Sequence, residues 1–268
     1  MKKETPEEKR ARLLSKAKES VGNAYAGSEH AVIQAINSYL EVEKVRNLLY
    51  ERIEEWYGMY FPELRVGSQS TLVKFITRFG GNKKDAKQEE VKELMGDKTN
   101  EVLNQIKNSI GREPSGDEFE TLKTLAESDL MLMKTEERID EYLSKSTKEL
   151  MPNITHLVDY KVAAELLSKA GSLERLAMMP ASTVQLLGAE KALFKHLRYG
   201  SKPPKYGVLF KLPQIATAGK KQRGRMARIY ATKITIAAKA DAFSKKFIAD
   251  KLKADLEKRM KMLQSQKS

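Results

Sequence analysis

Thirteen cations and a single acid occupy residues 186–240, and aromatic rings are interleaved with the cations. Lysine and arginine bind phosphate oxygens, and a partly exposed ring or guanidinium can stack on an unpaired base. Helical spacing places two groups on shared faces: Lys191, Lys195 and Arg198 with His196 beside them, and Arg225 and Arg228 with Thr232 one turn on. The chemistry that this pattern favours is binding to a polyanion, with nucleic acid as the first candidate.

The charge is unevenly distributed along the 268 residues, whose formal net charge is +13. Residues 1–150 hold 25 basic and 28 acidic side chains, whereas residues 151–268 hold 24 basic and 8 acidic ones. A field of one sign on so short a stretch indicates a polyanion partner. A solvated lysine-rich surface, or docking on an acidic protein, is the alternative. A membrane is disfavoured, because no apolar run approaches ~20 residues and no long amphipathic helix with bulky aromatics marks the basic segment.

Residues for catalysis or metal binding are missing or scattered. There is no cysteine, and His30, His156 and His196 are never spaced as a helical pair of ligands. No phosphate loop, nucleophile elbow or dinucleotide fingerprint is found. Glu190, alone among the cations of residues 186–240, leaves too few carboxylates for a two-metal nuclease site. We therefore expect no catalytic residue, metal or cofactor; an enzyme with an unrecognised site is the third and weakest interpretation.

A long helix is predicted to begin at Ser28, because apolar residues follow it at alternating spacings of three and four. The stripe consists of Val32, Ala35, Tyr39, Val42, Leu49, Ile53 and Trp56. Arg46 interrupts it, and Gly58 and Pro62 are expected to end the helix.

A second long helix is predicted near Ser115, where Ser115 and Glu118 have the spacing of a capping box. Its stripe consists of Leu122, Leu125, Leu132, Ile139, Leu143 and Leu150, and its interruptions are Asp129, Glu136 and Ser146. Two such stripes predict a long antiparallel coiled-coil hairpin over residues 28–150, with a small helical tip over residues 63–114. The stripes could also join two copies of the chain. The candidate self-association residues are Val32, Tyr39, Leu49, Ile53, Leu132 and Ile139.

The pattern changes after residue 150. Short segments rich in small residues indicate tightly packed helices, the first of them closed by Gly171. No period-2 alternation is long enough for a sheet, so we expect an all-α fold. In it, an N-terminal helix or linker (1–27) precedes the hairpin, a compact helical domain spans residues 151–255, and residues 256–268 form a basic tail.

Several motifs of the second half resemble, in order, those of the Nop domain: PNITHLVDYKVAAELLSKAGSLERLAMMPASTVQLLGAEKALF, PPKYGVLF, RGRMAR and AAKADAF. The segment AVIQAINSYLEVEKVRNLLYERIEEWYGMYFPEL resembles the coiled-coil entry of the same family. The resemblance covers roughly residues 25–255. It is greatest to the archaeal scaffold subunit of box C/D small ribonucleoproteins, a relative of nucleolar and spliceosomal Nop-domain proteins.

The resemblance implies a function and partners. Members of this family bind a kink-turn RNA that a small ribosomal-protein-like kink-turn-binding protein already holds, and their coiled coil joins two copies. An N-terminal domain recruits fibrillarin, which methylates ribose 2′-hydroxyls at guide-selected positions. Only about 25 residues precede the coiled coil here, so we expect that this sequence lacks the fibrillarin-recruiting domain. The implied location is the cytoplasm of an archaeal cell, or the nucleolus of a eukaryotic one.

The family motif GAEKALF maps onto residues 188–194. By the resemblance, the composite surface for RNA and protein is Gln185, Gly188, Ala189 and Glu190. The expected RNA contacts are Lys191, Lys195, His196, Arg198, Lys202, Lys205, Lys220, Lys221, Arg223, Arg225 and Arg228. Small residues ahead of a helix permit close approach, and its first amides favour an anion. Glu190 is open to three interpretations: a partner for a cation, an acceptor for a base or ribose hydroxyl, or a first-turn acid favoured by the helix dipole.

Overall fold

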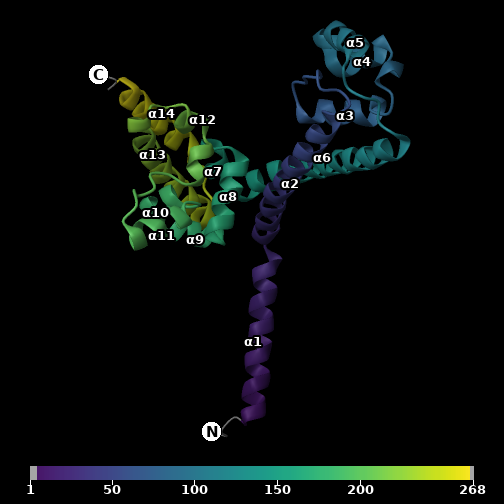
Figure 1. The fold of residues 1–268 in the computed structure, drawn as a ribbon. Helices are drawn as coiled ribbons and strands as arrows, with labels where there is room; N and C mark the ends of the chain where they lie inside the picture. The colour runs from purple at the N-terminus through teal and green to yellow at the C-terminus, as the bar shows by residue number, and fades with distance from the viewer. Residues whose placement is uncertain (1–4, 266–268) are drawn as a thin grey trace. The chain divides into compact units, whose positions relative to one another are not determined.

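The computed structural model describes residues 5–265, and regular structure in that range is helical throughout (Figure 1). The α-helices are α1 (Pro6–Ala26), α2 (Ser28–Tyr57), α3 (Gln69–Phe79), α4 (Gln88–Met95), α5 (Thr99–Asn108), α6 (Gly116–Leu150), α7 (Pro152–Leu157), α8 (Tyr160–Ala170), α9 (Leu173–Met178), α10 (Ala181–Leu186), α11 (Glu190–Tyr199), α12 (Pro213–Ala216), α13 (Lys220–Lys239) and α14 (Ala249–Ser265). Short 3-10 or π turns are η1 (Lys83–Asp85), η2 (Gly96–Lys98), η3 (Val208–Lys211) and η4 (Ala240–Ser244). The predicted all-α class is confirmed. Predictions for residues 1–4 and 266–268 lie outside the described range.

The chain divides into two compact units, one with residues 1–37 and 141–268 and the other with residues 38–140. The division falls inside α2 and α6, whereas the change in sequence pattern predicts a boundary at residue 151. The first turns of α2 are bonded within the larger unit. The Glu29 carboxylate accepts the Leu173 amide at 3.1 Å, and the Asn37 side-chain oxygen accepts the Ser168 hydroxyl at 2.8 Å.

In the smaller unit, the polar interruptions of the two stripes meet. Arg46 of α2 pairs with Glu136 of α6, and its Nε lies 3.5 Å from an Asp129 carboxylate oxygen. Asp129 is fully buried, and burial raises the pKa of its carboxyl. Because Ile53 packs in the same core as Leu122 while Arg46 meets Glu136, these parts of α2 and α6 run antiparallel. One polar layer favours a single register; supercoiling of the pair stays a prediction.

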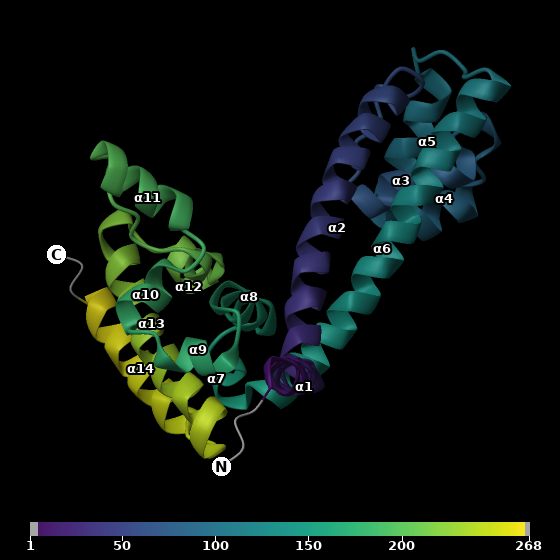
Figure 2. The ribbon, with the colours of Figure 1, turned by 90° about the horizontal axis from the view of Figure 1, so that it is seen from below.

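Three of the candidate self-association residues, Val32, Tyr39 and Ile53, are buried within the chain. Ile53 belongs to the core of the smaller unit, where helices α3, α4 and α5 pack at the end of the hairpin (Figure 2). The prediction is therefore corrected for these three residues, because intrachain packing uses their side chains. Leu49, Leu132 and Ile139 are half-buried.

The predicted capping box opens α6. The Ser115 hydroxyl accepts the Glu118 amide at 3.3 Å, and the Glu118 carboxylate accepts the Ser115 amide at 2.8 Å. Arg112 binds the same carboxylate through both terminal nitrogens. The Arg112 hydrogen bond, followed by the Ser115 amide, lowers the pKa of Glu118 from 4.5 to about 2.

The Glu118→Gln variant should make the smaller unit less sensitive to acid. A lowered carboxyl pKa stabilises the fold above pH 4.5, and this contribution disappears as the pH falls from 4.5 towards 2. Glutamine keeps the capping geometry but cannot titrate. Urea unfolding followed through Trp56, the one tryptophan of the sequence, should show a smaller stability loss between pH 6 and pH 3 than the parent chain shows. Equal losses in both chains would contradict this assignment.

In the larger unit, helices α7, α9, α10 and α14 pack around α13. The buried side of α13 consists largely of small residues, including Ala227, Ala231 and Ala238, so neighbouring backbones can approach closely. Gly171 ends α8 in the left-handed conformation, with a φ of 87°, as the sequence predicted. The opposite side of α13 remains available to carry charged residues.

The C-terminal segment is a packed helix. The sequence predicts a basic tail from residue 256, but residues 256–265 continue α14, which lies alongside α13 (Figure 2). Leu256, Met260 and Leu263 are buried at spacings of four and three. The lysines around them conceal this amphipathic stripe, which explains the error. In the described range, no helix is both long and apolar enough to cross a membrane.

Candidate nucleic-acid interface

A groove of about 710 Å³ gathers most of the predicted α13 cations in the larger unit. Its lining residues are Gln185, Pro204, Lys205, Lys221, Gly224, Arg225, Arg228, Ile229, Thr232, Arg259 and Leu263. This lining holds five cations and no acid. The arrangement suits phosphate groups, because lysine and arginine donors face a common space without a competing carboxylate in the lining.

Helix α13 sets the spacing of one wall. Lys221, Arg225, Arg228 and Thr232 follow one another at intervals of four, three and four residues, which keeps them on one face. The other face, with Met226 and Ala227, is buried. Packing of α13 therefore directs Lys221, Arg225 and Arg228 into the groove.

The position of Lys205 is fixed by hydrogen bonds to the backbone of its loop. The Gln185 side-chain amide donates to the Lys205 carbonyl at 2.6 Å and to the Gly224 carbonyl at 3.4 Å. The Gly207 amide donates to the Gln185 carbonyl at 3.1 Å, and only glycine fits there, because a Cβ would lie 1.9 Å from the Leu187 carbonyl oxygen. Gln185 is 8% exposed. Gln185 therefore supports the loop that carries Lys205 and also lines the groove, while its predicted place on the composite surface stays a prediction.

The GAEK turn precedes α11 as predicted. Gly188 has a φ of 86°, and its amide donates to the Glu190 carboxylate at 2.6 Å. This contact differs from the three interpretations given for Glu190, because the acid accepts an amide of its own turn. Ala189 is half-buried at the helix start.

Helix α11 projects its side chains outward, and none of its residues is buried. Lys191, Lys195 and Arg198 are exposed, but they do not line the groove. Phe194 and Leu197 are 67% and 70% exposed, unusually high values for large apolar side chains. His196 is half-buried, and its Nδ1 is bonded to the Ser201 carbonyl. Seven of the predicted cations thus form two groups, three on α11 and four in the groove.

Arg223 lies at a third place. Its Nε donates to the Ala218 carbonyl at 2.9 Å, and its guanidinium lies 5.4 Å from the centre of the Phe210 ring. Phe210 in turn stacks on Tyr206 at 4.7 Å. These contacts tie Arg223 to the loop rather than to the groove, so its replacement would also disturb local structure. Lys202 and Lys220 are exposed outside the groove lining.

Arg259 is a groove residue that the sequence does not predict. It lies in the segment predicted to be a tail, and its place in the groove depends on the packing of α14 against α13. Its Nε lies 3.0 Å from the Asp255 carboxylate, which also pairs with the buried Lys233. The pKa of Asp255 is lowered mainly by the hydrogen bond from Lys233, and the hydrogen bond from Arg259 lowers it further. The feature of the sequence that could have indicated a packed helix here is the apolar stripe of Leu256, Met260 and Leu263.

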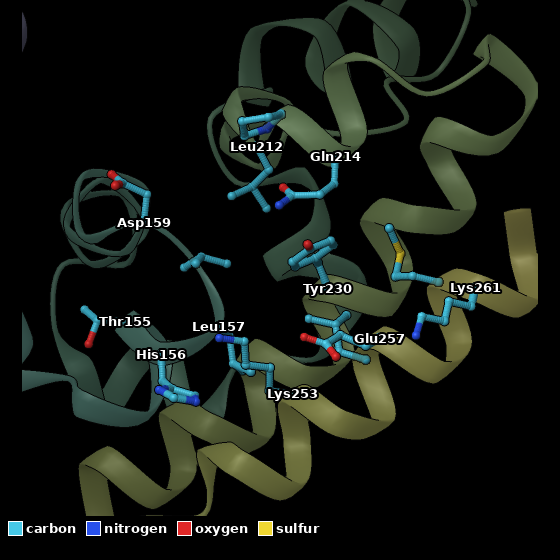
Figure 3. A pocket seen from close by; sticks show the side chains of 14 residues that line it. Thr155, His156, Leu157, Asp159, Leu212, Gln214, Tyr230, Lys253, Glu257 and Lys261 are labelled. Carbon is cyan, nitrogen blue, oxygen red and sulfur yellow. The ribbon is translucent and has the colours of Figure 1, made fainter.

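A second pocket, of about 570 Å³, lies between α7, α12 and α14 and has a different character (Figure 3). Tyr230 is buried beneath it, and burial raises the pKa of its hydroxyl. Lys253 and Lys261 line the pocket, but so do Asp159 and Glu257. The mixed charge does not favour a polyanion. Among the described residues, no group of three or more histidine, aspartate or glutamate side chains is placed to hold a metal ion.

The fold and the groove define an all-helical protein with a surface suited to a polyanion. A family model described as "Nop: snoRNA binding domain, fibrillarin" matches residues 39–262, and the chain belongs to this Nop family. An uncharacterised NOP5 family protein of Methanocaldococcus jannaschii is 40% identical over 231 residues, covering 85% of this chain and 56% of that protein. Nucleolar protein 56 of Caenorhabditis elegans is 35% identical over 249 residues, covering 86% and 51%.

A solved fibrillarin/Nop5p complex contains a chain of similar fold. The TM-score is 0.51 at 24% identity, covering 94% of this chain and 78% of that one. At this identity the likeness concerns the fold alone. The present chain spans about half the length of the curated relatives that it matches.

Proposed function

We propose that this chain is the RNA-binding and self-associating part of a scaffold subunit in a box C/D guide ribonucleoprotein. It binds kink-turn RNA together with a ribosomal-protein-like kink-turn-binding protein. In the complete particle it supports guide-directed 2′-O-methylation of ribose by fibrillarin. The role is assembly rather than catalysis. The observation that carries the proposal is the acid-free lining of the groove between α13 and α14, in a chain of the Nop family.

Helix α11 supports recognition of RNA and protein as one composite surface. It presents Lys191 and Lys195 for phosphates and, on the same exposed helix, Phe194 and Leu197 for an apolar protein contact. Bare RNA offers no apolar surface to Leu197, whereas a protein already seated on the RNA can bury both side chains. The groove would then contact RNA, and α11 would contact both the RNA and the protein.

Self-association is the second part of the proposal. Within the smaller unit, Val45, Leu48 and Met131 are large apolar residues that are at least half exposed, and Val45 and Leu48 share a face of α2. We infer that these residues, rather than the buried Val32, Tyr39 and Ile53, contact a second copy. Sedimentation of Val45→Asp/Leu48→Asp beside the parent chain tests this. We expect a dimer for the parent chain and a monomer for the double variant. A dimer for both chains would exclude Val45 and Leu48 from the interface.

Fibrillarin is proposed as a partner of the complete particle. The solved neighbour is a complex of Nop5p with fibrillarin, and the match to the curated NOP5 family relative covers only 56% of that relative. The family's fibrillarin-recruiting part lies outside the region of resemblance, so residues 25–255 are not expected to bind the methyltransferase. The corresponding location is the nucleolus in a eukaryote and the cytoplasm in an archaeon.

An order-of-addition gel shift tests the composite recognition. Box C/D kink-turn RNA is incubated with this chain, with the kink-turn-binding protein, and with both. We expect a supershift only with both proteins, because neither the RNA nor the protein alone completes the surface. Tight binding to bare RNA would instead support a coiled-coil adaptor with a general basic surface. If the chain adds no shift beyond that of the kink-turn-binding protein and does not shift bare RNA, the proposed function is contradicted.

A further inference from the structure

We propose that α14 forms the second wall of the RNA groove and that Arg259 is a phosphate-binding residue on it. The inference rests on the proposed function, because it takes RNA as the ligand of the groove. It goes further by extending the site to a helix outside the basic segment of residues 186–240. In this proposal the groove binds the sugar–phosphate backbone of the RNA from two sides. It is incomplete without residues 256–263.

The wall is fixed to the rest of the larger unit. Leu256 and Met260 are buried, and α14 packs along α13. Near its end, the Gln222 side-chain amide donates to the Leu263 carbonyl at 3.1 Å, which ties α14 to the first turn of α13. Leu263 itself lines the groove. The position of Arg259 relative to the α13 cations is therefore set by packing rather than by a mobile tail.

Arg259 is oriented by one of its nitrogens only. The Nε contact at 3.0 Å with Asp255, one turn earlier, aligns the guanidinium, and Arg259 makes no other polar contact with the described residues. Its side chain is 56% exposed, so its terminal nitrogens remain accessible to a ligand. An arginine held in this way loses less freedom when it binds a phosphate than an unrestrained side chain does.

The acid that holds Arg259 is already neutralised from the other side. The buried Lys233 of α13 pairs with the same Asp255 carboxylate. Lys233, Asp255 and Arg259 therefore sum to one positive charge, which is presented at the groove by Arg259. Lys221, Arg225 and Arg228 occupy the α13 wall. A phosphate between the walls would receive donors from both helices, a geometry that favours a backbone strand lying lengthwise in the groove.

Arg259→Gln tests the contact, with Lys258→Gln as the matched control. Lys258 is the adjacent cation on α14, is exposed and lines neither pocket. Affinity is measured by gel shift with box C/D kink-turn RNA already bound by the kink-turn-binding protein, over a series of salt concentrations. Loss of one phosphate contact should weaken binding about sixfold at 0.1 M salt and flatten the log–log salt slope by about 0.7–0.9. Lys258→Gln should change neither quantity measurably.

Two further measurements keep the outcomes distinct. Arg259→Lys should restore most of the salt slope, because it restores the charge, while thermal melting should show that each variant folds like the parent. Equal binding by Arg259→Gln and Lys258→Gln, or no recovery in Arg259→Lys, would overturn the α14 wall and leave the proposed function intact. Failure of the unaltered chain to join the RNA–protein complex would overturn the proposed function and this inference together.

Discussion

Reversing two groove cations at once, Arg225→Glu with Arg228→Glu, should weaken binding to the RNA–protein complex at least about 40-fold at 0.1 M salt. Each phosphate contact contributes about sixfold at that salt concentration, from a slope of about 0.7–0.9 per contact, and two contacts multiply. Repulsion between the new carboxylates and phosphates adds to the loss. Both side chains are exposed on α13, so the fold should persist. Gel-shift titration measures the affinity, and circular dichroism checks the fold.

The matched control is Lys251→Glu with Lys258→Glu. It changes the net charge by the same amount within the larger unit, but these exposed lysines of α14 lie outside the groove lining. Long-range attraction alone would make both double variants bind equally poorly. A large loss confined to the groove pair would assign the RNA contact to the groove. Equal affinities for the two double variants would contradict that assignment.

The Asp241→Ala variant should destabilise the larger unit by about 3 kcal/mol or more. Met151 and Pro152 provide no side-chain cap for α7, and the fully buried Asp241 carboxylate accepts the Asn153 and Ile154 amides at 3.0 Å each. It also accepts the Asn153 side-chain amide at 2.7 Å. Each buried donor left without an acceptor costs about 1–3 kcal/mol. Urea unfolding followed by circular dichroism measures the loss.

Trp56 provides an internal reference for that experiment. It lies in the smaller unit, so its fluorescence reports the unfolding of residues 38–140. Asp241→Ala should shift the circular dichroism transition to lower urea and leave the Trp56 transition in place. Glu174→Gln, at an exposed acid of α9, should shift neither. A change below about 1 kcal/mol in Asp241→Ala would show that the carboxylate is not essential to the start of α7.

Helix positions were predictable where a local rule decides them. The start of α2 at Ser28, its end before Gly58, the Ser115–Glu118 box and the Gly171 stop all depend on residues within a few positions of one another. Capping and left-handed stops are local chemistry, so sequence alone indicates them. The all-α class follows from the same patterns.

For the site, the sequence predicts only that a basic surface exists and not how its residues are arranged. The sequence indicated a basic surface, but not that Lys205 and Arg225 share a groove while Lys195 lies on another helix. Which way a charged side chain points depends on the packing of its helix, and that packing involves residues distant in sequence. Gln185 shows the same limit, because its burial follows from a hydrogen bond across 20 positions to Lys205. Arg259 was missed because the amphipathic stripe of α14 is short and surrounded by lysine.

Photo-crosslinking of the assembled RNA–protein complex, followed by identification of the crosslinked peptides, tests the central claim most directly. The complex contains this chain, the kink-turn-binding protein and box C/D kink-turn RNA. We predict RNA crosslinks on the peptides that carry Lys205, Arg225 and Arg228, and on the α14 peptide that carries Arg259. Crosslinks confined to residues 38–140, or to the mixed-charge pocket beside Tyr230, would contradict the assignment of the groove as the RNA site.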